Sequence, residues 1–234
     1  GVGAAATAAW LLSKDRDPVP PEPEGFFVSK RLQKGEDELF TWDLKTDEKR
    51  TLYSVAREYL IDIQVSPDRQ KVAFIGAITR ENEGVFRSIR NIKILNLQNG
   101  IVEKQIEAEN AVGVDWSKDG KTLVYLEKSP IVSPQDKSES RLVFHLMEDS
   151  TERSFTLNYS TRGFSLNPQN ENVVAVSIFR QQIPTVRIFD FTSGSPSELT
   201  AFSAYDSRWS PDGSKIAFQT LDNVYIRDLG TNKD

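Results

Sequence analysis

The sequence predicts an all-β fold, a β-propeller of four-stranded antiparallel blades preceded by a short apolar helical stub. Three observations support this fold class. A polar turn between two apolar runs occurs four times, a second apolar motif with a polar residue inside it occurs five times, and one repeat spans 40 to 50 residues. Repeats of this length with four strand-like runs are typical of propeller blades.

Each polar turn is expected to close a β-hairpin. The first polar residue of the turn falls at Ser66, Ser117, Asn167 and Ser210, so successive turns are 51, 50 and 43 residues apart. Serine and asparagine can bond to the local backbone, and a following proline presets φ for a turn. The aligned segments are DIQVSPDRQKVAFIG (62–76), GVDWSKDGKTLVYLE (113–127), GFSLNPQNENVVAVS (163–177) and DSRWSPDGSKIAFQT (206–220).

The second motif predicts two more strands in each repeat, which makes four strands, A to D. The motif reads TWDL (41–44), ILNL (94–97), VFHL (143–146), IFDF (188–191) and IRDL (226–229). Its polar position is assigned to Asp43, Asn96, His145, Asp190 and Asp228. The first repeat shows strands B, C and D without an A, and the last ends after C. We therefore expect five visible blades, two of them incomplete, in a ring of six or more; a closed five-bladed ring is the alternative.

The phrases VSPDRQKVAF (65–74) and WSPDGSKIAF (209–218) resemble the repeat of TolB-like β-propellers, which are related to the WD-type families. WSKDGKTLVY (116–125) is a near match and LNPQNENVVAV (166–176) a degenerate one. The resemblance covers most of residues 26–234 and implies the propeller fold. It implies no functional residue and no cellular role, because the motif is specific for the fold alone.

The first 25 residues differ from the rest. Residues 1–12, GVGAAATAAWLL, carry no charged side chain. As a helix they would reach about 18 Å, short of the roughly 30 Å of a bilayer's hydrocarbon layer. We interpret them as the end of a membrane anchor, with Val2, Trp10, Leu11 and Leu12 in the apolar layer; a signal-peptide remnant or an ordinary tail are the alternatives. Residues 13–25 are a proline-rich stalk, and residues 26–234 form the propeller.

Composition limits the chemistry. The net charge of −5 makes nucleic-acid binding unexpected, and the absence of cysteine excludes disulfides and thiolate metal sites. The single histidine, His145, excludes a histidine-rich metal centre within one chain. Because His145 is assigned to a structural position of the repeat, no catalytic residue is predicted, and no cofactor or metal site is predicted either.

The aromatic side chains recur in register with the repeats, so we expect them to pack between blades rather than to bind a ligand. They are Phe40, Trp42, Phe74, Trp116, Phe189, Trp209, Phe218 and Tyr225.

The longest loops, 79–87 and 127–140, fall between strands B and C and are expected on one rim, where loops on a rigid scaffold carry function. A candidate partner-docking surface there contains Arg80, Arg87, Arg90, Lys128 and Arg180; ordinary solvated surface charge is the alternative. We interpret the chain as a non-enzymatic, membrane-anchored interaction module facing the periplasm, a subunit or assembly factor of a membrane complex with protein partners; the cytosolic side stays open. The alternative is a periplasmic propeller that binds a small ligand or glycan in its channel and could hydrolyse it.

Overall fold

The computed structural model describes residues 26–33, 36–82, 85–128, 139–180, 183–193 and 197–230. The helical stub and the stalk predicted for residues 1–25 lie outside this described part, which contains strands and turns and no helix. The all-β prediction is therefore confirmed for the described residues.

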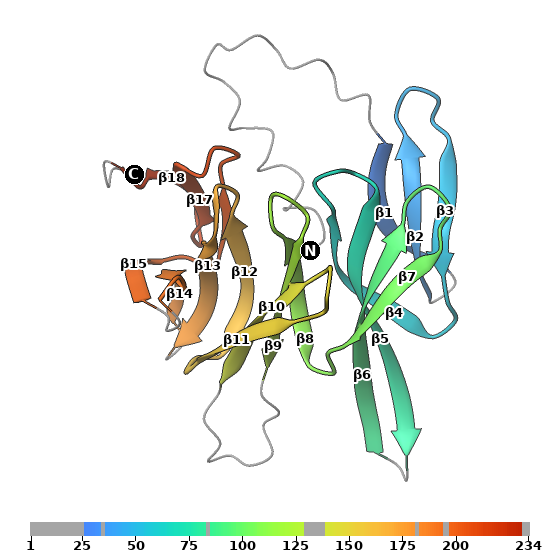
Figure 1. Cartoon of the computed structure of the whole chain (residues 1–234), viewed down its shortest axis with the longest axis horizontal. Coiled ribbons are helices and arrows are strands. Elements are labelled where there is room, and N and C mark those ends of the chain that lie inside the picture. Colours follow the sequence, from blue (N-terminus) through green and yellow to red (C-terminus); the bar gives the residue numbers. More distant parts are fainter. Residues whose placement is uncertain are drawn as a thin grey trace.

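Eighteen described strands form five antiparallel sheets that follow one another in chain order (Figure 1). Within every sheet, strands adjacent in sequence are also adjacent in space. The first sheet holds β1 (Phe26–Gln33), β2 (Glu36–Asp43) and β3 (Lys49–Ser54), and the fifth holds β16 (Asp206–Trp209), β17 (Lys215–Gln219) and β18 (Val224–Asp228).

The three sheets between them have four strands each. The second contains β4 (Glu58–Val65), β5 (Lys71–Asn82), β6 (Val85–Asn96) and β7 (Val102–Glu107). The third contains β8 (Ala111–Trp116), β9 (Thr122–Lys128), β10 (Ser140–Leu146) and β11 (Glu152–Leu157). The fourth contains β12 (Thr161–Asn167), β13 (Asn170–Arg180), β14 (Ile183–Asp190) and β15 (Ser197–Ser203). The predicted blade composition, with B to D first and A to C last, is thus confirmed.

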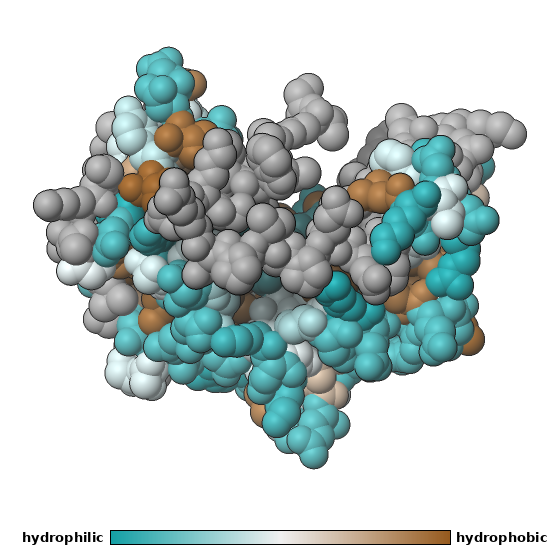
Figure 2. All heavy atoms as spheres, turned by 90° about the horizontal axis from the view of Figure 1, so that it is seen from above, coloured by the Kyte–Doolittle hydropathy of each residue, from teal (hydrophilic) through white to brown (hydrophobic). Residues whose placement is uncertain are grey.

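The first strand of each repeat lies innermost. Contacts between sheets join β4 to β8, β8 to β12 and β12 to β16, whereas the later strands extend outward. In the first sheet, where the described residues form strands B to D only, β2 contacts β4 instead. Figure 2, seen from above, shows that hydrophilic residues cover most of the described surface on this side, with a few separate hydrophobic ones among them.

The core consists of four apolar layers, one between each pair of neighbouring sheets. In β5, Val72 and Phe74 pack toward the first sheet, while Ala73 and Ile75 pack toward the third. Successive side chains of a strand point to opposite faces, so a strand with sheets on both sides must be apolar at nearly every position. This explains the unbroken apolar runs after each predicted turn.

The A–B turns are held by one repeated network. Ser66, Ser117 and Ser210 each donate a side-chain hydrogen bond to the aspartate two residues later, at 2.5 Å, 2.7 Å and 2.6 Å. The backbone N–H five residues after each serine donates to its hydroxyl, at 2.9 Å in all three turns. Gly120 and Gly213 take positive φ, as the sequence predicts, and Arg69 takes φ of 60° at the matching place in the turn that has no glycine.

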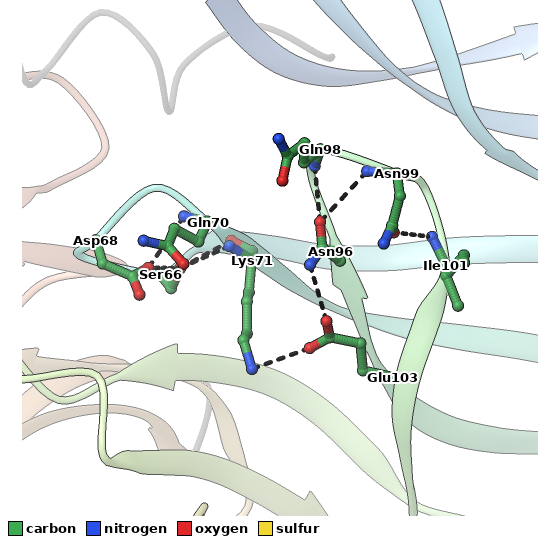
Figure 3. A network of polar contacts seen from close by, with 9 residues as sticks. All are labelled: Ser66, Asp68, Gln70, Lys71, Asn96, Gln98, Asn99, Ile101 and Glu103. Carbon is green, nitrogen blue, oxygen red and sulfur yellow. Dashed lines mark hydrogen bonds and ion pairs between the residues drawn. The ribbon is translucent and has the colours of Figure 1, made fainter.

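The C–D turns lie on the same rim as the A–B turns. In the second sheet, Lys71 and Asn96 both bind Glu103, and Asn96 also accepts the N–H groups of Gln98 and Asn99 (Figure 3). One chain of polar contacts therefore joins the two turns of this sheet.

The structure corrects the position assigned to His145. The N–H of Asn96 bonds across its turn to Ile101, and the corresponding bond in the third sheet comes from Leu146, not from His145. His145 instead pairs in register with Leu123, as Leu95 pairs with Val72. The motif was therefore aligned one residue too early in this repeat, and His145 occupies a buried position that its neighbour sheet fills with leucine.

Most of the predicted inter-blade aromatics pack as expected. Phe40, Phe74, Trp116, Phe189 and Phe218 are buried. Trp116 and Trp209 also donate through Nε1, at 3.1 Å, to the carbonyl oxygens of Gln64 and Ser165 in the preceding sheet. Trp42 and Trp209 are only partly buried, and Tyr225 is 41% exposed while its ring stacks on Phe218.

We expect Trp116→Ala to destabilise the protein by about 3–5 kcal/mol, because it leaves a cavity and removes an inter-sheet hydrogen bond. The same change at Trp209, which is less buried, should cost clearly less. Chemical unfolding of both variants measures the difference. Equal losses, or a loss at Trp116 within experimental error, would contradict the layered core.

Candidate functional site

A cavity of about 290 Å³ lies at the inner strands, where four sheets meet. The first residue of each of the four aligned hairpin segments lines it, namely Asp62, Gly113, Gly163 and Asp206. A side chain on Gly163 would meet no atom within 4 Å, and one on Gly113 would touch Phe164 and Asp62 at 3.4 Å. The two glycines therefore leave the space that the cavity occupies.

Three β-bulges shape the same cavity. The pairing register shifts between Ile61 and Ile63, between Ala111 and Gly113, and between Thr161 and Gly163. The residue within each shift, Asp62, Val112 or Arg162, lines the cavity. A bulge turns its extra side chain away from the regular alternation, and bulges are frequent beside binding sites.

The cavity wall carries both signs of charge. Asp62 accepts the N–H of Val114 at 2.9 Å on Oδ2 and the Gln64 side chain at 3.3 Å on Oδ1. Asp206 Oδ1 accepts the N–H of Ser207 at 2.8 Å and Nη1 of Arg208 at 3.2 Å. Arg162 and Arg208 also line the cavity, so a charged ligand would meet both cations and anions there.

One hydroxyl in the cavity wall has no protein partner. Ser177 lines the cavity and is 3% exposed, and its Oγ forms no hydrogen bond. A buried polar group without a partner costs free energy, and in native structures such a group usually has a reason.

Asp115 lies on β8, two residues after Gly113 of the cavity wall. Its Oδ2 accepts the N–H of Leu166 at 3.2 Å, and its Oδ1 accepts that of Trp116 at 2.9 Å. Burial raises its pKa to about 6, with a smaller raising effect from Asp62, against the lowering effects of these two hydrogen bonds and of Arg208. The protein therefore keeps a carboxylate here that is destabilised in its charged form.

Three cations gather at the rim that carries the D–A and B–C connections. The Arg90 guanidinium donates to the carbonyl oxygen of Ala111 at 2.8 Å, at the start of β8. Lys128 ends β9, and its pKa is lowered first by burial and then by the charges of Arg162 and Arg90. We call Arg90, Lys128 and Arg162 the rim cations.

The structure brings together only part of the predicted docking surface. Arg80 and Arg87 face each other across the β5–β6 hairpin, and Arg180 ends β13, but their side chains lie outside the described part of the structure. Arg90 and Lys128 do lie close to each other. Arg162 was missed, because its place directly before the third aligned segment gives no sign that a bulge turns it toward the cavity.

A second cavity, of about 640 Å³, lies between the first two sheets on the rim of the A–B turns. Two of its charged groups already bond to the protein: Arg50 donates to the carbonyl oxygens of Leu97 and Gln98, and Asp43 accepts the N–H groups of Lys45 and Thr46. We regard it as a groove between blades.

A buried ion pair between the same sheets has a structural role. Lys93 Nζ lies 2.6 Å from Glu58 Oε1, and Tyr53 donates to Glu58 Oε2 at 2.5 Å. The Glu58 side chain is 1% exposed, and a Cβ on Gly76 would lie 1.9 Å from its Oε1. Gly76 thus makes room for a carboxylate that joins the sheets.

His145 Nδ1 lies 2.8 Å from Glu152 Oε1, while Nε2 is buried without a partner. Within the described ranges, no three histidine, aspartate or glutamate side chains gather in a way that could hold a metal ion. Those ranges also contain no helix long and apolar enough to cross a membrane.

Comparison with known proteins shows the fold. No protein-family profile and no curated protein sequence matches the chain. Among solved structures it is similar to TolB from Acinetobacter baumannii, at 19% identity and a TM-score of 0.58, over 89% of this chain and 51% of that one. The β-propeller domain of Cps50 (Swd1) from Myceliophthora thermophila gives 12% identity and a TM-score of 0.58, over 89% and 64% of the two chains.

The β-propeller domain of the trilobed protease from Pyrococcus furiosus, with an open velcro topology, is similar at 16% identity and a TM-score of 0.59, over 87% of this chain and 65% of that one. The chain thus spans about half of TolB and under two thirds of the other two. The expected TolB-like or WD-type β-propeller is confirmed as a fold, and these identities show no more than the fold.

We expect Asp115→Asn to remove a loss of stability that the wild type undergoes as the pH rises from 4 through 6. Because the folded-state pKa is raised above the unfolded one, near 3.8, Asp115 stabilises the fold when protonated. That contribution, about 3 kcal/mol for two pKa units, is lost as pH rises from 4 through 6. The wild type should therefore lose stability relative to Asp115→Asn over this range, as measured by urea unfolding at several pH values.

Asp119→Asn is the matched control. Hydrogen bonds from Lys121 and Ser117 lower the pKa of Asp119, so its contribution is present above the unfolded pKa and is lost as pH falls. The two differences from wild type should have opposite slopes with pH. Equal slopes would show that burial does not govern Asp115.

Proposed function

We propose that the chain is a non-enzymatic protein-interaction module that recognises an acidic segment of its partner through the rim cations. The observation that carries this proposal is the cluster of Arg90, Lys128 and Arg162, in which two neighbouring charges lower the Lys128 pKa. Holding like charges together costs free energy, and a carboxylate-bearing partner relieves the repulsion.

The rim is suited to such recognition. Arg90 is fixed by its bond to Ala111, so one guanidinium is already oriented. The chain as a whole has a net charge of −5, so a local positive surface gives orientation as well as attraction. Arginine presents a planar fork of donors that matches a carboxylate.

The lack of an enzymatic role is part of the proposal. The only histidine of the chain is buried and bound to Glu152, so it is poorly placed to act as a general base for a nucleophile. Both oxygens of Asp62 in the central cavity accept protein hydrogen bonds, which does not favour a hydrolytic carboxylate there.

The double variant Lys128→Glu/Arg162→Glu tests the rim. We expect it to weaken binding of a fluorescently labelled glutamate-rich peptide at least tenfold in fluorescence anisotropy, with wild-type affinity falling as salt rises. Lys121→Glu/Lys215→Glu makes the same charge change in the A–B turns and should leave affinity within about twofold. Equal losses in both variants would mean that net charge, rather than this rim, attracts the peptide.

We also propose that residues 1–12 anchor the propeller to a membrane, with residues 13–25 as a stalk and the propeller on the periplasmic side. The support is the uncharged run that ends in Trp10, Leu11 and Leu12. Such an anchor fits a subunit or assembly factor of a membrane complex, because it would hold the rim near other membrane proteins.

Flotation with phospholipid vesicles tests the anchor. We expect the full chain to float with the vesicles and a variant with Trp10, Leu11 and Leu12 changed to serine to stay in the dense fraction, since three apolar side chains are lost. The control changes the exposed Leu221 and Val224 of the propeller to serine. Flotation of all three proteins, or of none, would contradict the anchor.

A second candidate function is the binding of a small ligand in the central channel. The cavity between the inner strands favours this function, because it is open and carries charged side chains. Apolar side chains filling the same space would have left no room for a ligand.

A further inference from the structure

The central cavity is constructed differently from the rest of the inner surface. Glycine stands at two of the four equivalent positions around it, and a bulge occurs in three inner strands at this level. Asp62 adopts a φ of 46°, which is unfavourable for a residue with a side chain. Three strained or irregular strands at one level are more than sheet packing requires, and such features concentrate at binding sites.

The charges of the wall select the ligand class. A purely anionic ligand would be attracted by Arg162 and Arg208 but repelled by the carboxylates of the wall. A purely cationic ligand would be attracted by the carboxylates but repelled by the two arginines. A molecule that carries both an ammonium and a carboxylate group can place each of them against a wall residue of opposite charge. Asp206 accepts the hydrogen bonds from Ser207 and Arg208 on Oδ1, so its other oxygen can face an ammonium group.

Ser177 supplies an independent indication. Its hydroxyl, which can donate and accept, lines the cavity and has no partner in the protein. Ser165, one strand away on β12, is also buried with an unpartnered hydroxyl but does not line the cavity. A ligand in the cavity could bond to the first hydroxyl and not to the second.

We propose that this cavity binds a small dipolar molecule of the amino-acid class, a free amino acid or a dipeptide. Its carboxylate lies against the guanidinium of Arg162, its ammonium group lies against Asp206, and a polar atom of the ligand bonds to Ser177. The volume of about 290 Å³ suits a molecule of this size and is too small for an oligosaccharide. The proposal gives the second candidate function its ligand class and does not depend on the rim cations as a docking surface.

The test uses the full chain and defined probes. L-alanine, L-glutamate, L-lysine and glycylglycine are compared with N-acetyl-L-alanine and L-alaninamide, each of which lacks one charge, by saturation-transfer NMR and thermal shift. We expect at least one unblocked probe to bind with a Kd below about 10 mM. The blocked analogue should bind at least tenfold more weakly, because it lacks one of the two charged groups that contact Arg162 and Asp206.

Three variants locate the site. Gly163→Leu fills the open space and should abolish binding; Ser177→Ala should weaken it about five- to tenfold. Ser165→Ala, the matched control, should bind as the wild type does, and Lys121→Glu, which alters an A–B turn, should change affinity less than threefold. Thermal unfolding without ligand shows whether each variant is folded, and Ser177→Ala remains informative if Gly163→Leu is not.

The proposal is overturned if no unblocked probe binds, if the blocked analogues bind equally well, or if Ser177→Ala and Ser165→Ala weaken binding to the same extent. Failure of the rim proposal looks different. In that case Lys128→Glu/Arg162→Glu binds the acidic peptide as the wild type does, while Gly163→Leu still abolishes binding of the small probe.

Discussion

The structure depends on one constraint, that each internal sheet packs on both of its faces. In β9, Leu123 and Tyr125 enter the layer shared with the second sheet, and Val124 and Leu126 enter the layer shared with the fourth. Because both faces are covered, the alternation of the strand is apolar on both sides. A sheet removed from this series would expose two layers rather than one, so the repeats stabilise one another as neighbours.

The inner edges of the sheets need a different solution, because an edge strand has backbone groups without a partner strand. Carboxylates supply part of it. Asp37, Asp62 and Asp115 each accept the N–H of an inner strand in the next sheet, from Leu60, Val114 and Leu166. These bonds cross three successive interfaces between the sheets. The fold therefore favours acidic side chains at the inner strands, and of these three only Asp62, which lies in a bulge, lines the cavity.

The sequence predicted the hairpins, the strand order and the incomplete first and last sheets, because turn chemistry and apolar runs are local features. It misplaced His145 by one residue, because the apolar pattern around it fits either alignment and only the pairing with Leu123 decides. Arg162 and Ser177 were missed for a related reason. A bulge depends on the register between two strands, and an unpartnered hydroxyl depends on everything around it, so neither leaves a pattern along the chain.

Comparison among the repeats separates what the fold requires from what this chain adds. The position of Asp115 is filled by Gln64, Ser165 and Arg208 in the other sheets, so the packing there does not need a carboxylate. Lys128 likewise corresponds to Ala77 of the second sheet. Burial raises the pKa of Asp115 and lowers that of Lys128, so each charged form is held at an energetic cost at a position where these other repeats carry neither a carboxylate nor a lysine. Departures from local consistency of this kind concentrate at functional sites. Lys128 is influenced by Arg162 and Arg90 near the start of β8, whereas Asp115 lies near the end of β8 and is influenced by Asp62 and Arg208. Each of the two groups is therefore coupled to a charged residue that lines the cavity, and the surroundings of this cavity, rather than the repeated turns, are where the chain departs from its own repeat.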